Sequence, residues 1–505
     1  PFAVPPAPPT GKPAAAVATA ASPQPPQPRG RPQRRPIPAI RPPLPVDRKL
    51  LASGDLIRGQ VLLAAGQHNL EELSLEGQVQ LIEQPAANAA DAYGFDIRGD
   101  QLQITRPTRF DARAIISGRP AEVRSPRLNL EGPLIEFDRG RNRVAVDGGG
   151  RLTVPAAGGA GLGDLGLISG QAPRQPVPSA AASNEPLAIT WQGRMDFDGQ
   201  TARFVDRVET GSGGTELKAG SLDCVFSQPI DFSRQRQPQP PAQTQNDIAR
   251  IACGNGVRII SRTQADADGL LVSHEQLFVR DLFFDRLTGD VRGTGPGRLT
   301  STRRGDGSLP LGTPALPGGP TSPPPAAAAA EKKPGITYLG VDFQRGFTGN
   351  LTRRQMEFQQ RVETIWGPVP TWKDSLDLHS PNGLGEGVVA VTSDVLGIGQ
   401  TPPVPGQPRR AIELSAGGNV LVEGSGFTAR SARLSYSELK DLLVFEGDGR
   451  TDAQLYRQER IGGPTSTASA GKILYWRQHN RVDVQDARYL DFDQLGGGSL
   501  PNAPF

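Results

Sequence analysis

Apolar and polar residues alternate along most of the chain, which is the pattern of β-strands rather than of helices. Leu73 and Leu75 alternate with polar neighbours, and after Gly77 the same pattern continues through Val79 and Leu81. A period of two places one row of side chains on each face of a strand, with the apolar row on one side only. Turn signals recur about every ten residues, a spacing typical of sandwiches, barrels and stacked sheets. The chain is therefore predicted to be all-β.

Segments rich in proline, glycine and alanine interrupt the alternation and divide the chain. Such segments bury too little apolar surface to offset the entropy of ordering them. We expect a disordered tether at 1–48, a β module at 49–154, a second β module at 187–302, a disordered linker at 303–334, a β segment at 335–398 and a last β module at 411–495.

Two families of internal repeats run through these blocks. The segment from Phe137 to Leu152 recurs from Phe284 to Leu299 with a constant shift of 147, and more loosely from Tyr475 to Val484. A second pattern, Arg207-Val208-Glu209-Thr210, recurs as Arg361-Val362-Glu363-Thr364 with a shift of 154. Repetition of β-type units predicts stacked modules rather than one closed enzyme core.

Glycine clusters between alternating runs are interpreted as turns. Gly99-Asp100 separates two alternating runs, so we expect it to connect two strands. Gly293–Gly297 is rich enough in glycine to suggest a phosphate loop, but no Lys-Ser/Thr follows it, which favours a hairpin turn. Trp366 and Trp372 flank a Gly-Pro-Val-Pro loop that either caps a cleft or packs on its own module.

Composition narrows the function classes. The 505 residues include 61 Gly and 49 Pro, which argues against long helices, and 55 basic residues nearly balance 52 acidic ones. The arginines near the start, at 29–41, have no interleaved aromatic residues for base stacking, so nucleic acid is not an expected partner. The sequence begins at Pro1 and its first methionine is Met195, which we interpret as a processed or truncated product.

Candidate chemistry is sparse. The four histidines lie far apart in sequence, and no nucleophile elbow or Cys-x-x-Cys motif is present. We therefore expect no enzyme activity, no cofactor and no metal site. Cys224 and Cys253 lie in neighbouring strand-like segments and would form a disulfide if those strands pair suitably, or would otherwise be buried free thiols.

The order of several motifs resembles the LptA/OstA-like family of periplasmic lipopolysaccharide-transport bridge proteins. The motifs are Leu75-Glu76-Gly77-Gln78-Val79, Ile97-Arg98-Gly99-Asp100-Gln101-Leu102, and Gly118-Arg119-Pro120-Ala121-Glu122-Val123. Gly418-Asn419-Val420 is a shorter counterpart of the first. The resemblance covers 70–154 and 411–490 well; the middle blocks are more similar to LptC-like modules of the same pathway.

This resemblance implies tandem antiparallel β-jellyroll modules, V-shaped folded sheets joined by Pro/Gly-rich linkers, whose apolar inner groove carries acyl chains. It implies a non-enzymatic scaffold in the periplasm or cell envelope, anchored through a segment before Pro1, with lipopolysaccharide or a related acylated lipid as ligand. Other bridge proteins would dock by edge-strand pairing. The alternative is a structural envelope protein whose β modules are dry.

Alternation gives the residues that would line such a groove: Leu75, Val79, Leu81, Phe95, Ile97, Leu102, Ile104, Phe137, Val144, Val146, Val420, Val422, Leu434, Tyr436, Phe445, Ile473, Tyr475, Val482 and Val484. Arginines at strand ends are candidates for phosphorylated headgroups: Arg98, Arg139, Arg143 and Arg430. In the dry alternative the same apolar residues fill a packed core.

Overall fold

The computed structural model describes residues 49–64, 67–84, 95–107, 109, 111–125, 128–154, 187–212, 214–230, 248–264, 269–305, 335–381, 383–401, 411–424, 426–458, 465–476 and 481–490. These residues contain strands and loops but no helix, so none of them forms a helix that could span a membrane. The chain divides into two units, Pro1–Asp47 and Arg48–Phe505, and every described strand belongs to the second. The predicted tether and the 306–334 part of the predicted linker lie outside the described residues.

The strands of the first block are β1 Lys49–Ser53, β2 Leu56–Ala64, β3 Gln67–Gln84, β4 Asp96–Thr105, β5 Arg113–Ser125, β6 Leu128–Asp138, β7 Arg143–Asp147 and β8 Gly150–Val154. The second block contains β9 Leu187–Trp191, β10 Arg194–Phe197, β11 Thr201–Ser212, β12 Thr215–Phe226, β13 Ile248–Gly254, β14 Val257–Gln264, β15 Leu271–Val279, β16 Asp281–Asp285, β17 Asp290–Thr294 and β18 Gly297–Gly305.

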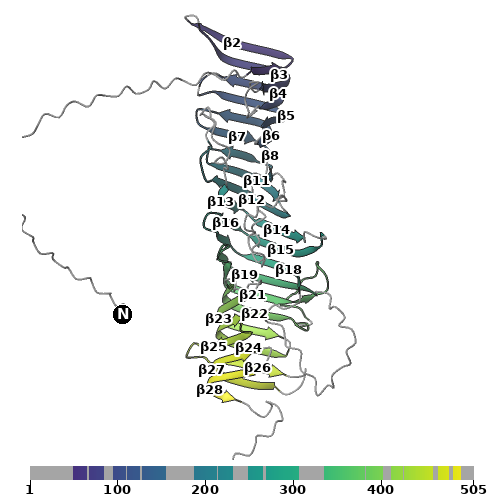
Figure 1. The fold of residues 1–505 in the computed structure, drawn as a ribbon, viewed down its shortest axis with the longest axis vertical. Helices are drawn as coiled ribbons and strands as arrows, with labels where there is room; N and C mark the ends of the chain where they lie inside the picture. The colour runs from purple at the N-terminus through teal and green to yellow at the C-terminus, as the bar shows by residue number, and fades with distance from the viewer. Residues whose placement is uncertain are drawn as a thin grey trace, which may run out of the picture. The chain divides into compact units, whose positions relative to one another are not determined.

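The remaining strands are β19 Gly335–Phe343, β20 Gly346–Asn350, β21 Gln355–Val369, β22 Val389–Gln400, β23 Ile412–Gly424, β24 Phe427–Ser437, β25 Leu442–Glu446, β26 Ala453–Gln458, β27 Thr465–Trp476 and β28 Arg481–Leu490. All of them join one 28-stranded sheet with antiparallel pairing, which confirms the predicted all-β class (Figure 1).

The sheet continues across the predicted breaks between blocks. β8 pairs with β9 and β7 with β10, on either side of 155–186. β18 pairs with β19 and β17 with β20, on either side of 306–334. The blocks therefore share one backbone hydrogen-bond network, whatever the structure of the segments that connect them.

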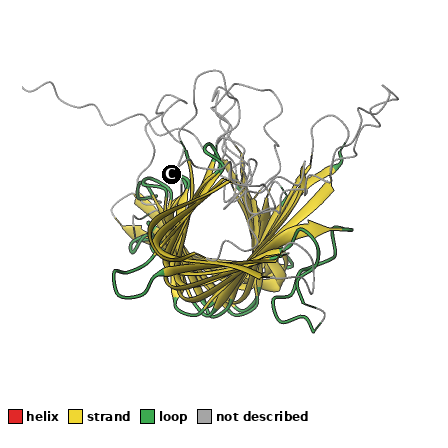
Figure 2. Ribbon diagram, turned by 90° about the horizontal axis from the view of Figure 1, so that it is seen from below, coloured by secondary structure: helices red, strands yellow, loops and turns green. Residues whose placement is uncertain are grey.

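The sheet is folded along its length into two arms, seen end-on in Figure 2. Arm 1 contains β2, β7, β10, β13, β16, β17, β20 and β25, and arm 2 contains β1, β8, β9, β14, β15, β18, β19 and β26. Longer strands such as β3, β11, β21 and β23 contribute one half to each arm. We call the line where the arms meet the bend, and the far end of each arm its margin.

Between β12 and β21 every strand belongs to one arm only. The pairing closes a ring of ten strands: β12, β13, β16, β17, β20, β21, β19, β18, β15 and β14. Smaller rings of the same kind contain β7, β8, β9 and β10, between β6 and β11, and β25 and β26, between β24 and β27. Continuous strands that cross the bend separate these rings.

In β3 and β11, a pair of residues in the left-handed region produces the bend. Gly77-Gln78 have φ values of 74° and 46°, and Asp206-Arg207 have 69° and 46°. The strand register shifts at these same residues, between Glu76 and Val79 in β3 and between Val205 and Val208 in β11. Each pair is thus a bulge that turns the strand while pairing resumes beyond it.

The pattern Arg-Val-Glu-Thr that recurs with a shift of 154 residues, here called the 154-residue repeat, also corresponds to a bend. Gln360-Arg361 in β21 have φ values of 65° and 49°, close to those of Asp206-Arg207 in β11. The register shift in β21 lies between Gln359 and Val362. The repeat therefore marks equivalent bends in two strands, and Gly418-Asn419 form a further one in β23 (75° and 49°).

Two predicted turns are wrong, because glycine marks bends here. Gly99-Asp100 lies inside the single strand β4, where the register against β5 shifts between Arg98 and Gln101. Gly293–Gly297 is not a hairpin, since β17 pairs with β16 and β20, whereas β18 pairs with β15 and β19. Glycine favours both structures for the same reason, its freedom of backbone conformation.

Close approach of neighbouring backbones also requires glycine at the bend. A Cβ on Gly150 would lie 2.4 Å from the carbonyl oxygen of Glu131 and 2.6 Å from a ring carbon of Trp191. Neither neighbour is the free end of a flexible chain, so a larger residue must displace the sheet itself. Gly417, near the bend in β23, has nothing within 4 Å of the same position.

The two cysteines are free and buried, so the disulfide expectation is corrected. Their strands do pair, but Cys253 lies opposite Leu222 and Cys224 opposite Ile251. The cysteines are therefore diagonal neighbours, for which Cα atoms are about 7–8 Å apart, beyond the usual disulfide range. Burial raises the pKa of the Cys224 thiol, and burial raises the pKa of Cys253 to about 12.

We predict that Gly150→Ala lowers the free energy of unfolding by about 2 kcal/mol, because the added methyl overpacks the bend. The matched variant Gly417→Ala should change it by less than about 0.5 kcal/mol. Urea denaturation followed by tryptophan fluorescence measures both. Equal effects of the two variants would contradict a close-packed bend at Gly150.

Both thiols should resist alkylation by iodoacetamide at pH 8 in the folded protein and react fully in denaturant, because burial keeps them protonated and inaccessible. Intact mass before and after reduction should be identical. A mass gain on reduction would contradict the free-thiol assignment.

Candidate functional site on the inner face of the folded sheet

All predicted groove residues lie on the inner face of the fold. Each belongs to one continuous apolar cluster or packs against it, and the cluster extends from β3 to β27, with side chains of β28 packed on it. Leu75 in β3 and Phe445 in β25, close to opposite ends of the sheet, are both fully buried. The alternation in the sequence therefore identified the correct face of these strands.

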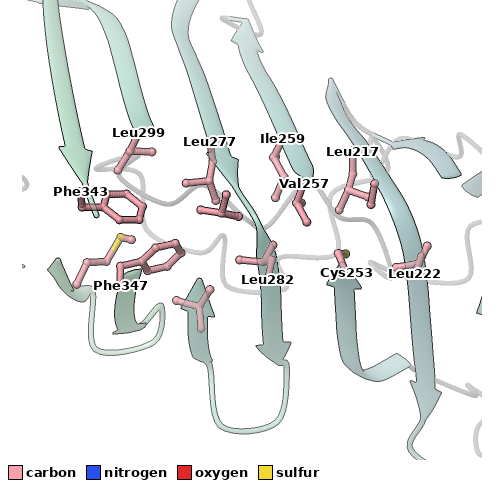
Figure 3. Packing of buried hydrophobic residues seen from close by; sticks show 14 of the residues in the cluster. Leu217, Leu222, Cys253, Val257, Ile259, Leu277, Leu282, Leu299, Phe343 and Phe347 are labelled. Atoms are coloured by element: carbon pink, nitrogen blue, oxygen red, sulfur yellow. The ribbon is translucent and has the colours of Figure 1, made fainter. Parts of the chain in front are cut away.

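The part of the inner face near the bend is a packed core. Leu217, Ile259, Leu277 and Leu299 of arm 2 face Leu222, Cys253, Leu282 and Phe347 of arm 1 (Figure 3). All eight are at most 4% exposed. In this zone the side chains of the two arms pack closely against one another.

Aromatic residues fill the core most completely where β19, β20 and β21 meet. The ring centroids of Phe343, Phe347 and Phe358 lie 5.3–5.8 Å apart. Sequence reasoning missed these residues because the groove candidates came only from the first and last blocks. The spacing of Val341 and Phe343, and of Met356 and Phe358, carries the same period of two and would have identified them.

Burial decreases from the bend toward both margins in most strands, although Tyr436 and Leu443, nearer the margin of arm 1, are 3% and 0% exposed. Ile135 is fully buried, and Phe137, two residues nearer the margin of arm 1, is half-buried. Half-buried apolar residues follow the margin of arm 1: Leu73, Ile104, Ala114, Phe137, Phe226, Ile248, Phe284, Ile398 and Leu414. Others follow the margin of arm 2: Phe95, Leu128, Leu187, Leu339, Phe427 and Ala468. Among the described strands, no pairing joins one margin to the other.

In the ten-strand ring, the inner face of arm 2 changes character from the bend to the margin. The register row nearer the bend, row A, is aliphatic between two threonines: Thr210, Leu217, Ile259, Leu277, Leu299, Val341 and Thr364. The positions nearer the margin are mostly polar, and we call them the polar strip: Thr215, Ser261, Thr263, Ser273, Glu275, Ser301 and Arg303. Sequence reasoning missed this strip.

The polar strip is internally hydrogen-bonded. The hydroxyls of Thr215 and Ser261 lie 3.1 Å apart. Arg303 donates to Glu275 Oε1 at 2.7 Å and from Nε to Ser301 Oγ at 3.0 Å. Glu275 is 5% exposed, so its charge is compensated by this ion pair rather than by water. The strip is therefore polar but has no net charge.

The predicted headgroup arginines do not face the groove. Arg98 and Arg143 alternate with inner residues and point to the outer face, where Arg98 bonds Asp96 and Arg143 Nε donates to Asp196 at 2.7 Å. These hydrogen bonds raise the pKa of both guanidinium groups. Arg430 is exposed on the outer face of β24, and Arg139 lies in the turn that follows β6.

Other sequence candidates form no shared site among the described residues. His274 is on the outer face of β15, and His379 lies 3.3 Å from Glu363. No group of three or more His, Cys, Asp or Glu is placed to hold a metal in the described part of the chain. Trp366 lies in β21 rather than in a loop and is 3% exposed on the inner face.

The two ends of the sheet differ from its middle because, among the described strands, each end strand is paired on one side. β1 and β2 each pair with β3, and β28 pairs with β27, with no second partner in the described part of the chain. Several apolar side chains of β2 are exposed, among them Ile57 (48%), Leu62 (53%) and Leu63 (71%). An apolar edge strand of this kind is a docking surface or an aggregation hazard.

In comparisons with known proteins, no family model matches the chain, and no curated protein matches its sequence.

Proposed function

We propose that this protein is a non-enzymatic scaffold that binds and carries an acylated lipid of the cell envelope, with lipopolysaccharide as the leading ligand class. The observation that carries the proposal is the pair of half-buried apolar margins on the inner face, such as Phe137 on arm 1 and Leu128 on arm 2. A dry sheet sandwich would gain stability by burying these rows fully. Their partial exposure leaves apolar surface available to a hydrocarbon guest.

The energetics favour acyl chains over any polar ligand at the margins. Each buried CH₂ contributes about 0.8 kcal/mol, so a chain of about 12–14 carbons contributes roughly 10 kcal/mol before entropic costs. A single hydrogen bond contributes about 1 kcal/mol. The packed zone near the bend would stay intact and act as the floor of the groove.

The family resemblance supports the same assignment through particular residues. The motif Leu75–Val79 and its counterpart Gly418–Val420 contain the bends of β3 and β23. In these strands the motifs thus correspond to the feature that folds the sheet. A periplasmic location and an anchor before Pro1 are part of this proposal.

Partners are proposed to dock edge to edge. Among the described strands, β2 and β28 each have one edge with no paired neighbour, which suits strand addition by another folded sheet. Such docking would continue the inner face from one protein to the next, with about 4.8 Å added per strand.

The second candidate is a structural envelope protein with a dry interior. The near-complete burial of inner residues such as Phe358 and Phe445 favours it. Under this reading the margins are simply the periphery of the core and bind nothing.

We predict saturable uptake of a fluorescent fatty acid by the full chain, with displacement by a lipid A-like ligand. The double variant Phe137→Asp/Phe284→Asp should lower the amount bound at least two-fold, because it places charge at equivalent positions of the arm 1 margin. Leu287→Asp, in a turn where the side chain is 74% exposed, is the matched control. Fluorescence titration measures all three. Absence of saturable uptake by the unmodified chain would favour the dry scaffold.

We predict concentration-dependent self-association through the end strands, since β28 of one copy offers an edge to β2 of another. Ile57→Lys/Leu62→Lys should shift the association midpoint to at least ten-fold higher protein concentration, because it places charge on the apolar edge. Leu287→Lys is the control. Light scattering across a dilution series measures the effect, and equal association of both variants would contradict docking at β2.

A further inference from the structure

Three buried side-chain hydroxyls have no hydrogen-bond partner among the described residues: those of Thr210 in β11, Thr364 in β21 and Ser431 in β24. Thr210 and Thr364 are 5% and 9% exposed, and Ser431 is half-buried. Thr210 and Thr364 occupy the same position of the 154-residue repeat, three residues after the start of each copy. A buried hydroxyl without a partner is disfavoured, so its occurrence twice at one repeat position requires an explanation.

Local packing does not explain the hydroxyls. The register neighbours of Thr210 are Ile189 and Leu217, and those of Thr364 are Val341 and Val391. Valine has the same shape, packs well in strands and would leave no unsatisfied group at either position. Each threonine lies two residues after the buried valine that follows the bend, Val208 or Val362, so its side chain is on the same inner face.

A further unpartnered donor lies beside Thr364. Trp366 follows it on the inner face of β21, and its indole Nε1 is buried without a hydrogen-bond partner among the described residues. An indole nitrogen only donates, so the missing partner must be an acceptor. The hydroxyls of Thr210 and Thr364 can also donate a hydrogen bond, so an acceptor would satisfy all three groups.

The two threonines lie at the two ends of row A. We call the inner face between them, with row A and the polar strip on arm 2, the amphipathic stretch. Row A joins them across six strand spacings, about 29 Å at 4.8 Å each. Beside this row lies the polar strip on arm 2, whose only charged side chains form the Glu275–Arg303 pair. The margin of arm 1 opposite is apolar, with Phe226, Ile248 and Phe284.

We propose that this stretch binds the neutral polar linkage of an acylated amphiphile, with an ester or amide carbonyl accepting hydrogen bonds from Thr210 or Thr364. The acyl chain lies on the apolar margin of arm 1. The neutral ion pair and the hydroxyls of the polar strip match uncharged carbonyl and hydroxyl groups better than a phosphate, which requires uncompensated cations. This inference rests on the proposed lipid-binding function and specifies which part of the lipid is recognised, and where.

The test compares monopalmitoylglycerol, which has an ester carbonyl, with hexadecylglycerol, the ether that lacks it. Both are titrated against the full chain by displacement of the fluorescent fatty acid. The unmodified protein should bind the ester about five-fold more tightly than the ether, the value of one net hydrogen bond. In Thr210→Val/Thr364→Val the ester should bind no more tightly than the ether, while the affinity for the ether stays unchanged.

Thr348→Val is the matched control, because Thr348 is exposed on β20. This variant should keep the preference for the ester. The thermal midpoint of Thr210→Val/Thr364→Val should equal or exceed that of the unmodified protein, since the substitutions remove unpartnered hydroxyls. A lowered midpoint would show that the hydroxyls are bonded within the fold and would overturn the proposal.

The remaining outcomes separate the two proposals. If the fatty acid and the ether bind but the ester has no advantage, or keeps its advantage in the double variant, the linkage site is refuted and lipid binding stands. If no probe binds saturably to the unmodified chain, both the linkage site and the lipid-binding function are refuted.

Discussion

The structure depends on bending strands without ending their pairing. A bulge of two left-handed residues does this in β3, β11, β21 and β23, and the conformation costs about 1–2 kcal/mol for each residue other than glycine. In β11 and β21 neither residue of the bulge is glycine. Val208 and Val362, which follow these bulges, are fully buried on the inner face. Burial of the side chains that the bend turns inward thus offsets the backbone cost.

Alignment of the bends along the sheet creates both the core and the groove candidate. Where arms meet, their inner faces are close enough for Leu277 and Leu282 to exclude water, and this zone supplies the apolar burial that stabilises the fold. The arms diverge toward the margins (Figure 2), so side chains such as Phe284 lose neighbours and become half-exposed. The divergence of the two arms therefore explains both the packed zone near the bend and the half-buried apolar margins. The same kinds of residue occur in both.

The sequence predicts local features of this fold well and non-local ones poorly. Alternation identified the strands and the inward side of residues such as Val79 and Tyr475, because side-chain direction in a strand follows from spacing alone. It did not separate bends from turns at Gly99, because both need the same backbone freedom. Nor did it place Cys224 relative to Cys253, because a two-residue register offset depends on the strands around them. The polar strip was missed for a related reason, since it exists only where four strands, β12, β14, β15 and β18, lie side by side.

The threonines of the 154-residue repeat show how a fold-level constraint and a functional one can share a motif. The arginine and valine of each copy are explained by the bend, since Arg207 and Arg361 form the bulge and the valines are buried beyond it. Thr210 and Thr364 are not explained in this way, because valine would satisfy the same packing with no lone hydroxyl. A buried hydroxyl that the fold does not need is most simply accounted for by a group outside the fold. An amphiphile whose chain follows the apolar margin would bring its carbonyl to the stretch of the inner face that lies between the hydroxyls of Thr210 and Thr364.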